Sequence, residues 1–243
     1  MVARWDFPRE IGEAVAIIWH ALGTKLALAI FLADLFFILL HVAAVNGVIG
    51  GNERLFRVDK DRSLSEWFEY AKLFVSFLLI FYLSVSRKFY QIMPMALVIF
   101  YLCLDDSLRL HEYMGDVLVP AHDNVGQALF TMMVGAATVV MAAIGCMLSQ
   151  RPGRIQIISV LLPILLLGGF GSIVDAFHEV MMRFVPRADN LIGFIEDGGE
   201  LVSMSVLLLT CVRLADLGVG HKSEHPTITR GIFSSPAMRK WRA

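Results

Sequence analysis

Six stretches of this sequence are each long enough and apolar enough to cross a lipid bilayer as a helix. The hydrocarbon layer is about 30 Å thick and a helix rises about 1.5 Å per residue, so a span needs about 20 residues. The expected spans are residues 25–48, 67–86, 93–111, 125–148, 155–177 and 191–214. Hydrophobic residues make up 57% of the chain, more than a water-soluble core could bury. We therefore expect an all-α integral membrane protein.

The remaining segments complete a single polytopic membrane domain over residues 1–217. Residues 8–22 form an expected interfacial helix with Glu10 and Glu13 on its polar side, and residues 218–243 form a polar tail. Lys and Arg are more frequent in the segments on the side of the termini, which places both termini and the tail in the cytoplasm. The loop GNERLFRVDKDRS, at 51–63, carries four basic residues against this trend.

Two sequence echoes suggest an internal pseudo-symmetric repeat of helix pairs. HEYMGDVLVP, at 111–120, follows the third span, and HEVMMRFVP, at 178–186, follows the fifth. FEYAKLFVSF, at 68–77, and IEDGGELVSM, at 195–204, align Glu69 with Glu196. Membrane proteins are often built from such repeats.

The expected topology brings four helix ends into one layer opposite the cytoplasm: the starts of the second and sixth spans and the ends of the third and fifth. Carboxylates and imidazoles gather there. In the fifth span, Asp175, His178 and Glu179 share one helix face, and no Lys or Arg occurs between residues 155 and 182. Unpaired charges at membrane depth cost about 2.5–3.5 kcal/mol each, so a bound metal cation is the simplest counter-charge. Gly168, Gly169 and Gly171 are expected to let a neighbouring helix approach closely.

This layer contains the predicted metal ligands, which are Glu69, Asp106, His111, Glu112, Asp175, His178, Glu179, Glu196 and Glu200. The set is similar to that of di-iron bundles, in which two helices each give a Glu and two others give a carboxylate with a His. A di-iron site is therefore favoured, with manganese as a close variant. The pattern departs from the bundle motif because Asp105 and Asp106 precede His111 by six and five residues, which would require a distorted helix.

Other metals and a site without metal remain open. Zinc would need about three of these ligands and an open position, and Met114 and Met181 leave copper as an alternative. Arg109 could instead form ordinary helix-surface pairs with Asp105, Asp106 and Glu112, and Lys72 could neutralise Glu69. Asp34 is the only acid deep in the first span and is assigned no role.

The sequence thus predicts a membrane-embedded metalloenzyme, an oxidoreductase or a hydrolase, acting on a lipid-soluble substrate. Glu112 and Glu179 would move protons as the catalytic residues. A cation or proton transporter is an alternative, although acids are absent from the middles of the second to sixth spans. An accessory subunit of a larger membrane complex is another. The expected partners are the lipid bilayer and further membrane subunits, with no nucleic acid.

Overall fold

The computed structural model describes residues 6–60, 62–120, 123–174, 177, 181 and 189–219, and these residues form helices and short connections without strands. The long helices are α1 (Phe7–Leu22), α2 (Lys25–Val45), α3 (Leu64–Ser86), α4 (Met93–Leu108), α6 (Asp123–Leu148), α7 (Arg151–Gly168) and α9 (Asp189–Val219). The shorter ones are α5 (Leu110–Leu118), the 3₁₀ turns η1 (Glu53–Phe56) and η2 (Tyr90–Ile92), and the π-helical segment η3 (Gly169–Val174).

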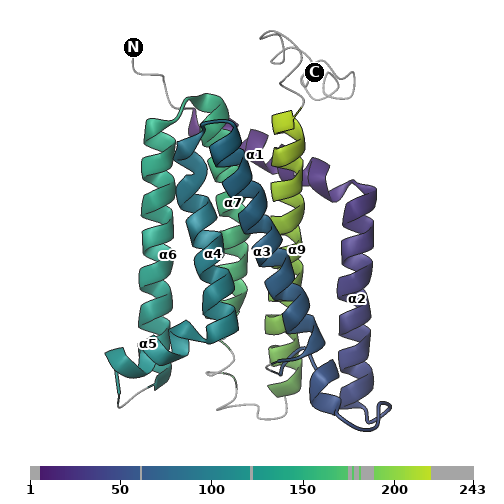
Figure 1. Ribbon diagram of the computed structural model, residues 1–243. Helices are drawn as coiled ribbons and strands as arrows, with labels where there is room; N and C mark the ends of the chain where they lie inside the picture. The colour runs from purple at the N-terminus through teal and green to yellow at the C-terminus, as the bar shows by residue number, and fades with distance from the viewer. Residues whose placement is uncertain are drawn as a thin grey trace.

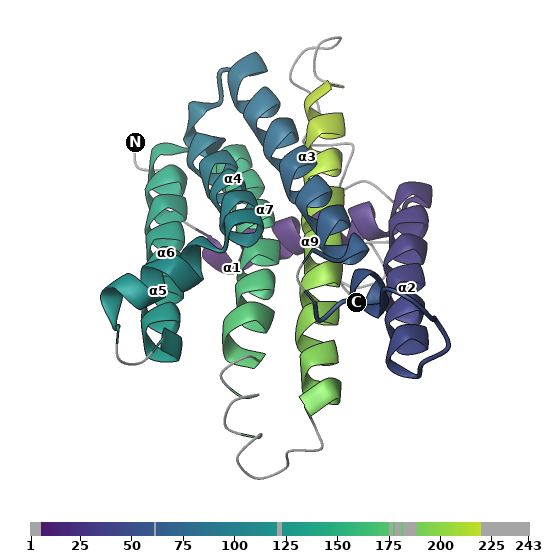
Figure 2. The ribbon, with the colours of Figure 1, turned by 60° about the horizontal axis from the view of Figure 1, so that its bottom comes forward.

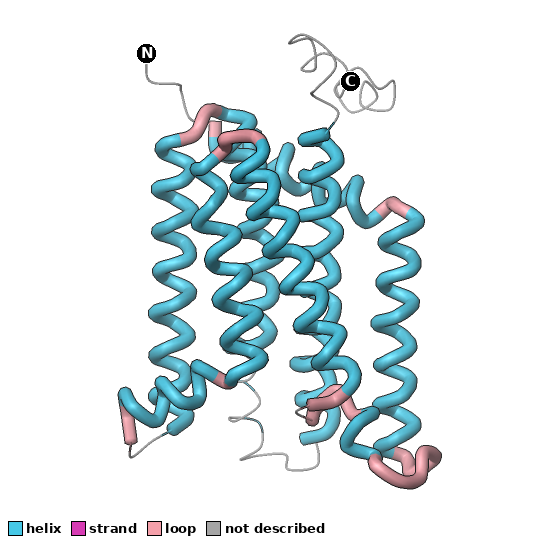
Figure 3. The backbone as a smooth tube through the Cα atoms, viewed as in Figure 1, coloured by secondary structure: helices cyan, strands magenta, loops and turns pink. Residues whose placement is uncertain are grey.

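The long helices except α1 run up and down side by side as a bundle, and α1 crosses one end of it (Figure 1). Short connections join most of them, as the tube in Figure 3 shows. In the described residues, five segments are long and apolar enough to cross a membrane: Lys25–Val45, Leu64–Ser86, Tyr90–Leu108, Val125–Leu148 and Arg151–Ser172. The all-α class is therefore confirmed, and five of the expected spans coincide with such helices.

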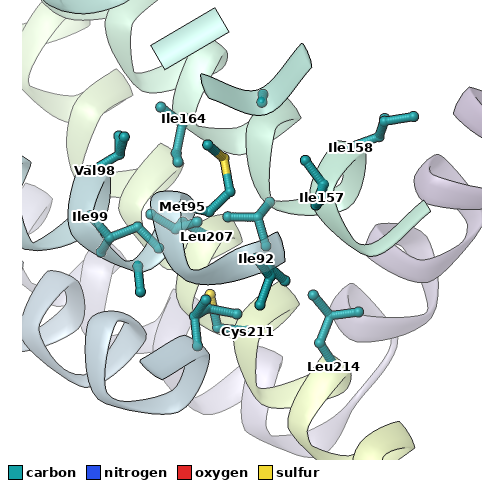
Figure 4. Packing of buried hydrophobic residues seen from close by; sticks show 14 of the residues in the cluster. Ile92, Met95, Val98, Ile99, Ile157, Ile158, Ile164, Leu207, Cys211 and Leu214 are labelled. Atoms are coloured by element: carbon teal, nitrogen blue, oxygen red, sulfur yellow. The ribbon is translucent and has the colours of Figure 1, made fainter. Parts of the chain in front are cut away.

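Apolar side chains fill the interior of the bundle and also cover its outside. Ile92, Met95, Ile99, Ile157 and Leu207 are fully or almost fully buried where α4, α7 and α9 meet (Figure 4). Large apolar side chains on α2 and α6 face outward instead, such as Leu28 and Met132, which are 63% and 69% exposed. Water-soluble proteins rarely expose large contiguous apolar patches, so this surface suits lipid.

Helix α1 is anchored to the bundle by a buried ion pair. Arg154 on α7 donates from Nε and Nη2 to the Glu10 carboxylate at 2.5–3.1 Å, and both side chains are at most 3% exposed. Glu10 was expected on the polar face of an interfacial helix, and the structure corrects this, since Glu10 faces the bundle. A second contact joins Arg151 Nη2 to Glu13 at 2.5 Å. The α1 helix is thus part of the packed domain.

Several helix ends differ from the expected bounds for local reasons. Helix α2 ends at Val45, before the expected residue 48, because Asn46 caps it and Gly47 takes a φ of +66°. Helix α3 begins earlier than expected, at Leu64, because the Ser63 hydroxyl accepts the Glu66 N–H. Helix α4 ends at Leu108 and not at His111, because Arg109 adopts a left-handed conformation with a φ of +55°.

The last two spans also differ from expectation. The fifth begins at Arg151, with Pro152 in its first turn, and changes from α-helix to π-helix after Gly168. The sixth expected span falls on α9, which runs from Asp189 to Val219 and so extends into the expected tail, but α9 is not among the five segments that are long and apolar enough to cross a membrane. Residues 220–243 of that tail, and the second copy of the proposed repeat at 178–186 apart from Met181, lie outside the described residues.

Candidate functional site

Four helix ends meet at the end of the bundle opposite α1. They are the start of α3, the end of α4, the π-helical continuation of α7 and the start of α9 (Figure 1). Figure 2 turns this end forward and shows α5 leading away from the end of α4 toward α6. The helix ends that carry the predicted ligands therefore lie at one level of the molecule.

Three of the predicted ligands come together there from three different helices. Glu69 on α3 is 8% exposed, and its charge interacts with that of Asp106 on α4. Glu200 on α9 interacts electrostatically with both Asp106 and Glu69. Asp106 Oδ2 is buried without a hydrogen-bond partner in the described part of the chain. Buried carboxylates that repel one another need protons or a cation between them.

Glycine contacts between η3 and α9 fix the position of Glu200. A Cβ placed on Gly171 would collide with Glu200 Oε1, and a Cβ placed on Gly199 would collide with the Phe170 ring. Each helix therefore uses a glycine to admit a side chain of the other. The expected close approach holds at Gly171, whereas Gly168 and Gly169 have open space around their Cβ positions.

Lys72 does not bond to Glu69, although it lies one helical turn away. Its Nζ donates to Asp34 Oδ1 at 3.2 Å, to the Leu201 carbonyl at 2.6 Å and to Ser205 Oγ at 3.1 Å. A lysine ammonium has three N–H donors, so these contacts occupy all of them. The charge of Lys72 still acts on Glu69 from a distance.

Tyr70 connects α3 to α4 beside these carboxylates. Its hydroxyl donates to the Asp106 carbonyl at 3.2 Å, and Cys103 Sγ lies 3.8 Å from the Tyr70 carbonyl. The Glu66 carboxylate also interacts with the Tyr70 hydroxyl and with Asp106. Sequence spacing did not single out Tyr70, because an aromatic residue near a helix start is equally common at a membrane interface.

The break at Arg109 gives His111 and Glu112 partners of their own. The His111 N–H donates to Asp105 Oδ1 at 2.7 Å, and His111 Nδ1 lies 3.2 Å from Asp105 Oδ2. The hydrogen bond with Asp105 raises the pKa of His111 against the opposing effect of burial. Arg109 Nε lies 3.1 Å from Glu112 Oε1, which is the helix-surface pair that the sequence offered as an alternative to metal. The helix distortion that a di-iron site would require before His111 is therefore present. The His111 side chain, however, pairs with Asp105.

The remaining predicted ligands fall into two groups. Glu196 lies on α9 one turn before Glu200 and interacts with it electrostatically, as does the neighbouring Asp197. Asp175, His178 and Glu179 lie outside the described residues. Within the described ranges, no group of three or more His, Cys, Asp or Glu side chains could hold a metal ion.

Comparison with known proteins places this bundle in a family. The chain belongs to the family described as a domain of unknown function (DUF8692), whose model matches residues 14–215. The match covers most of α1, all of α2 to α7 and nearly all of α9, and so includes the carboxylates described above. No curated protein and no solved structure matches the chain.

Proposed function

We propose that this chain is a multi-pass membrane protein with six spans, the sixth formed by α9, and with both termini in the cytoplasm. The apolar outer surface of α2 and α6 supports a lipid bilayer as its main partner. The basic residues Arg87, Lys88, Arg151 and Arg154 lie at or near helix ends on the α1 side, as expected for the cytoplasmic face. The carboxylates of Glu69, Asp106 and Glu200 would then lie near the opposite face.

We further propose that these carboxylates, together with the predicted ligands His178 and Glu179, bind a divalent metal cation as part of a metalloenzyme site, since no group of three among the described side chains could hold one. The observation that carries this proposal is the convergence of Glu69, Asp106 and Glu200 from three helices, with one buried Asp106 oxygen that has no described donor. A cation would cancel their repulsion and give that oxygen a ligand bond. His178 and Glu179 stay predicted ligands, and either would extend the set.

The donor types restrict the chemistry of such a site. Carboxylate oxygens with an imidazole suit iron, manganese or zinc, and di-iron remains the favoured choice. A bound metal would act as a Lewis acid, while a neighbouring carboxylate such as Glu179 or Glu112 moves a proton. Because the carboxylates lie inside a bundle whose outer surface suits lipid, the expected substrate is lipid-soluble, and the reaction is an oxidation or a hydrolysis.

Metal analysis with matched glycine variants tests the metal site. In Gly171→Ala the new methyl group must displace the Glu200 carboxylate, whereas Gly169→Ala adds a methyl group to open space in the same π-helical segment. We expect stoichiometric Fe, Mn, Zn or Cu in purified wild type and in Gly169→Ala, and a loss of most of it in Gly171→Ala and in Glu200→Gln. Metal-free wild-type protein, or equal metal in all four proteins, would refute the proposal.

A proton or cation transporter is the second candidate, and one observation favours it. Ionisable side chains continue from the carboxylates into the bundle, because Lys72 and Asp34 are buried together one turn beyond Glu69. The absence of acids from the middles of the second to sixth spans still speaks against a path, because Asp34 belongs to the first span. Proton uptake into vesicles that is lost in Glu69→Gln, in protein free of metal, would support transport over the enzyme.

An accessory subunit is the third candidate, and partner binding distinguishes it from the other two. An accessory subunit should co-purify with other membrane proteins, and His178→Ala should leave this co-purification unchanged. The enzyme and transporter proposals both predict that His178→Ala lowers enzymatic activity or transport.

A further inference from the structure

A pocket of about 480 Å³ opens at the same end of the bundle, outside the three buried carboxylates. Its lining comes from the loop after α2, the start of α3 and the end of α4, and it includes Arg54, Arg62 and Arg109. The pocket reaches the carboxylates through Glu66 and Tyr70, which line it and also interact with Asp106.

The lining has the chemistry of an anion site. The lining includes three arginine residues and one glutamate, together with Tyr70 and Ser107. Guanidinium groups present paired N–H donors that match the oxygens of phosphates and carboxylates. Arg109 also contacts Glu112, but a guanidinium has five N–H donors and can bind two acceptors at once.

Backbone conformation supports a functional reason for these arginines. Arg62 and Arg109 both have positive φ, at +59° and +55°, and Lys88 is the only other described non-glycine residue that does. A left-handed conformation is sterically unfavourable for an L-residue, and such residues concentrate at ligand sites. Two of the three described residues with this conformation therefore line one pocket.

The rim of the pocket is suited to the boundary between lipid headgroups and hydrocarbon. Leu108 lines it and is 62% exposed. Trp67 is 65% exposed and contacts the Tyr70 ring, with the ring centroids 6.2 Å apart. Exposed Trp and Tyr side chains gather at the headgroup level of membrane proteins. An anion held by the arginines would therefore lie at that level.

We propose that Arg54, Arg62 and Arg109 bind an oxyanion of the phosphate or carboxylate type at this pocket. Its source is either the headgroup of an anionic lipid or a free small anion. The site accounts for Arg54 and Arg62, two of the four basic residues at 51–63, whereas Arg57 and Lys60 pair with Asp59. This inference does not depend on a metal at Glu69, Asp106 and Glu200.

The site is tested by measuring how much lipid and phosphate the wild type and two variants bind. The protein is purified in nanodiscs of phosphatidylcholine with a minor share of phosphatidylglycerol, and retained phosphatidylglycerol is counted by native mass spectrometry with and without inorganic phosphate. The double variant Arg54→Gln/Arg109→Gln removes two guanidinium groups from the lining. Lys88→Gln removes one positive charge, also from a left-handed position, between α3 and η2 at the other end of the bundle.

We expect the double variant to weaken anion binding at least about tenfold, because it removes two charged hydrogen-bond donors from the lining. Lys88→Gln should bind as wild type. Retained lipid that phosphate does not displace identifies a lipid headgroup. Phosphate binding that is lost in the double variant identifies a free anion. The proposal fails if wild type retains neither ligand, or if both variants lose binding equally. A thermal unfolding curve for each variant establishes that it is folded. Arg109→Lys keeps the positive charge, so this variant should retain part of the anion binding.

Discussion

The Nζ atom of Lys72 lies 3.2 Å from Oδ1 of Asp34, and both side chains are at most 2% exposed. Ser205 Oγ donates to the other Asp34 oxygen at 2.7 Å, so α2, α3 and α9 meet in one polar contact inside an apolar bundle. Helix α2 exposes most of its large apolar side chains. The ion pair therefore has a large part in determining how α2 docks.

Removing one partner of this ion pair should destabilise the protein strongly. We expect Lys72→Met to cost about 3–5 kcal/mol, because Asp34 is left buried without its cation. The double variant Asp34→Leu/Lys72→Met should recover much of that loss, because no buried charge remains. Cys103, Cys146 and Cys211 are free and buried, so thermal unfolding can be followed with a thiol-reactive dye. A Lys72→Met variant that is as stable as wild type would show that the pair contributes little.

The contact between α1 and α7 gives a second prediction with its own control. Arg154→Gln should destabilise the protein by about 3 kcal/mol, because Glu10 loses a cation that contacts both of its oxygens. Arg151→Gln removes the partner of Glu13, but Arg151 is 40% exposed, so its effect should stay below about 1 kcal/mol. Faster labelling of Cys146 in Arg154→Gln than in Arg151→Gln would report the loss of α1. Equal labelling would contradict a special role for Arg154.

The loop between α2 and α3 should show an acid-dependent contribution to stability. Burial alone would raise the pKa of Asp59, but hydrogen bonds from Arg57 and Lys60 outweigh it and lower the pKa to about 2. A lowered carboxyl pKa stabilises the fold above its ordinary value of 3.8, and this contribution is lost as the pH falls toward 2. We expect Asp59→Asn to cost about 2 kcal/mol at pH 7 and progressively less below pH 4. A difference that does not change with pH would contradict this assignment.

The His111 pair should titrate in the opposite sense. Its contact with Asp105 raises the pKa of His111, so the pair stabilises the fold below the ordinary histidine value of 6.5, and this is lost as the pH rises through the raised pKa. In Asp105→Asn the His111 pKa should fall, as measured from the imidazole proton shifts in an NMR titration. An unchanged His111 pKa in Asp105→Asn would contradict this assignment.

Relief of backbone strain should separate stability from anion binding. Arg109→Gly should stabilise the fold by about 0.5–1 kcal/mol, because glycine adopts the left-handed conformation without steric cost, and it should weaken anion binding. Lys88→Gly should give a similar stabilisation with unchanged binding. The two measurements are a thermal unfolding curve and the nanodisc lipid count. If Arg109→Gly left anion binding at the wild-type level, the strain at this position would have another cause.

The sequence alone determined the helices and the end of the bundle at which the acids gather. Long apolar runs specify helices through length and composition, and their alternating direction places the starts of α3 and α9 beside the ends of α4 and α7. Glu69 and Asp106 could be singled out in this way because each lies near such an end, whereas Glu200 lies eleven residues after the start of α9. The identity of a metal could not, because ligand distances depend on helix packing.

Only the tertiary structure decided which charges pair. Lys72 is the only Lys or Arg in its expected span, and Asp34 is the only acid in its own, which was a signal that the two could pair. Lys72 is nevertheless closer in sequence to Glu69, and the rotation of α2 and α9 about their axes is what directs it to Asp34 and Ser205. The same holds for Glu10 with Arg154 and for the turn at Arg109. The two ion pairs join residues that are far apart in the chain, and the turn depends on the left-handed conformation of a single residue. Helical periodicity in the sequence predicts neither of these features.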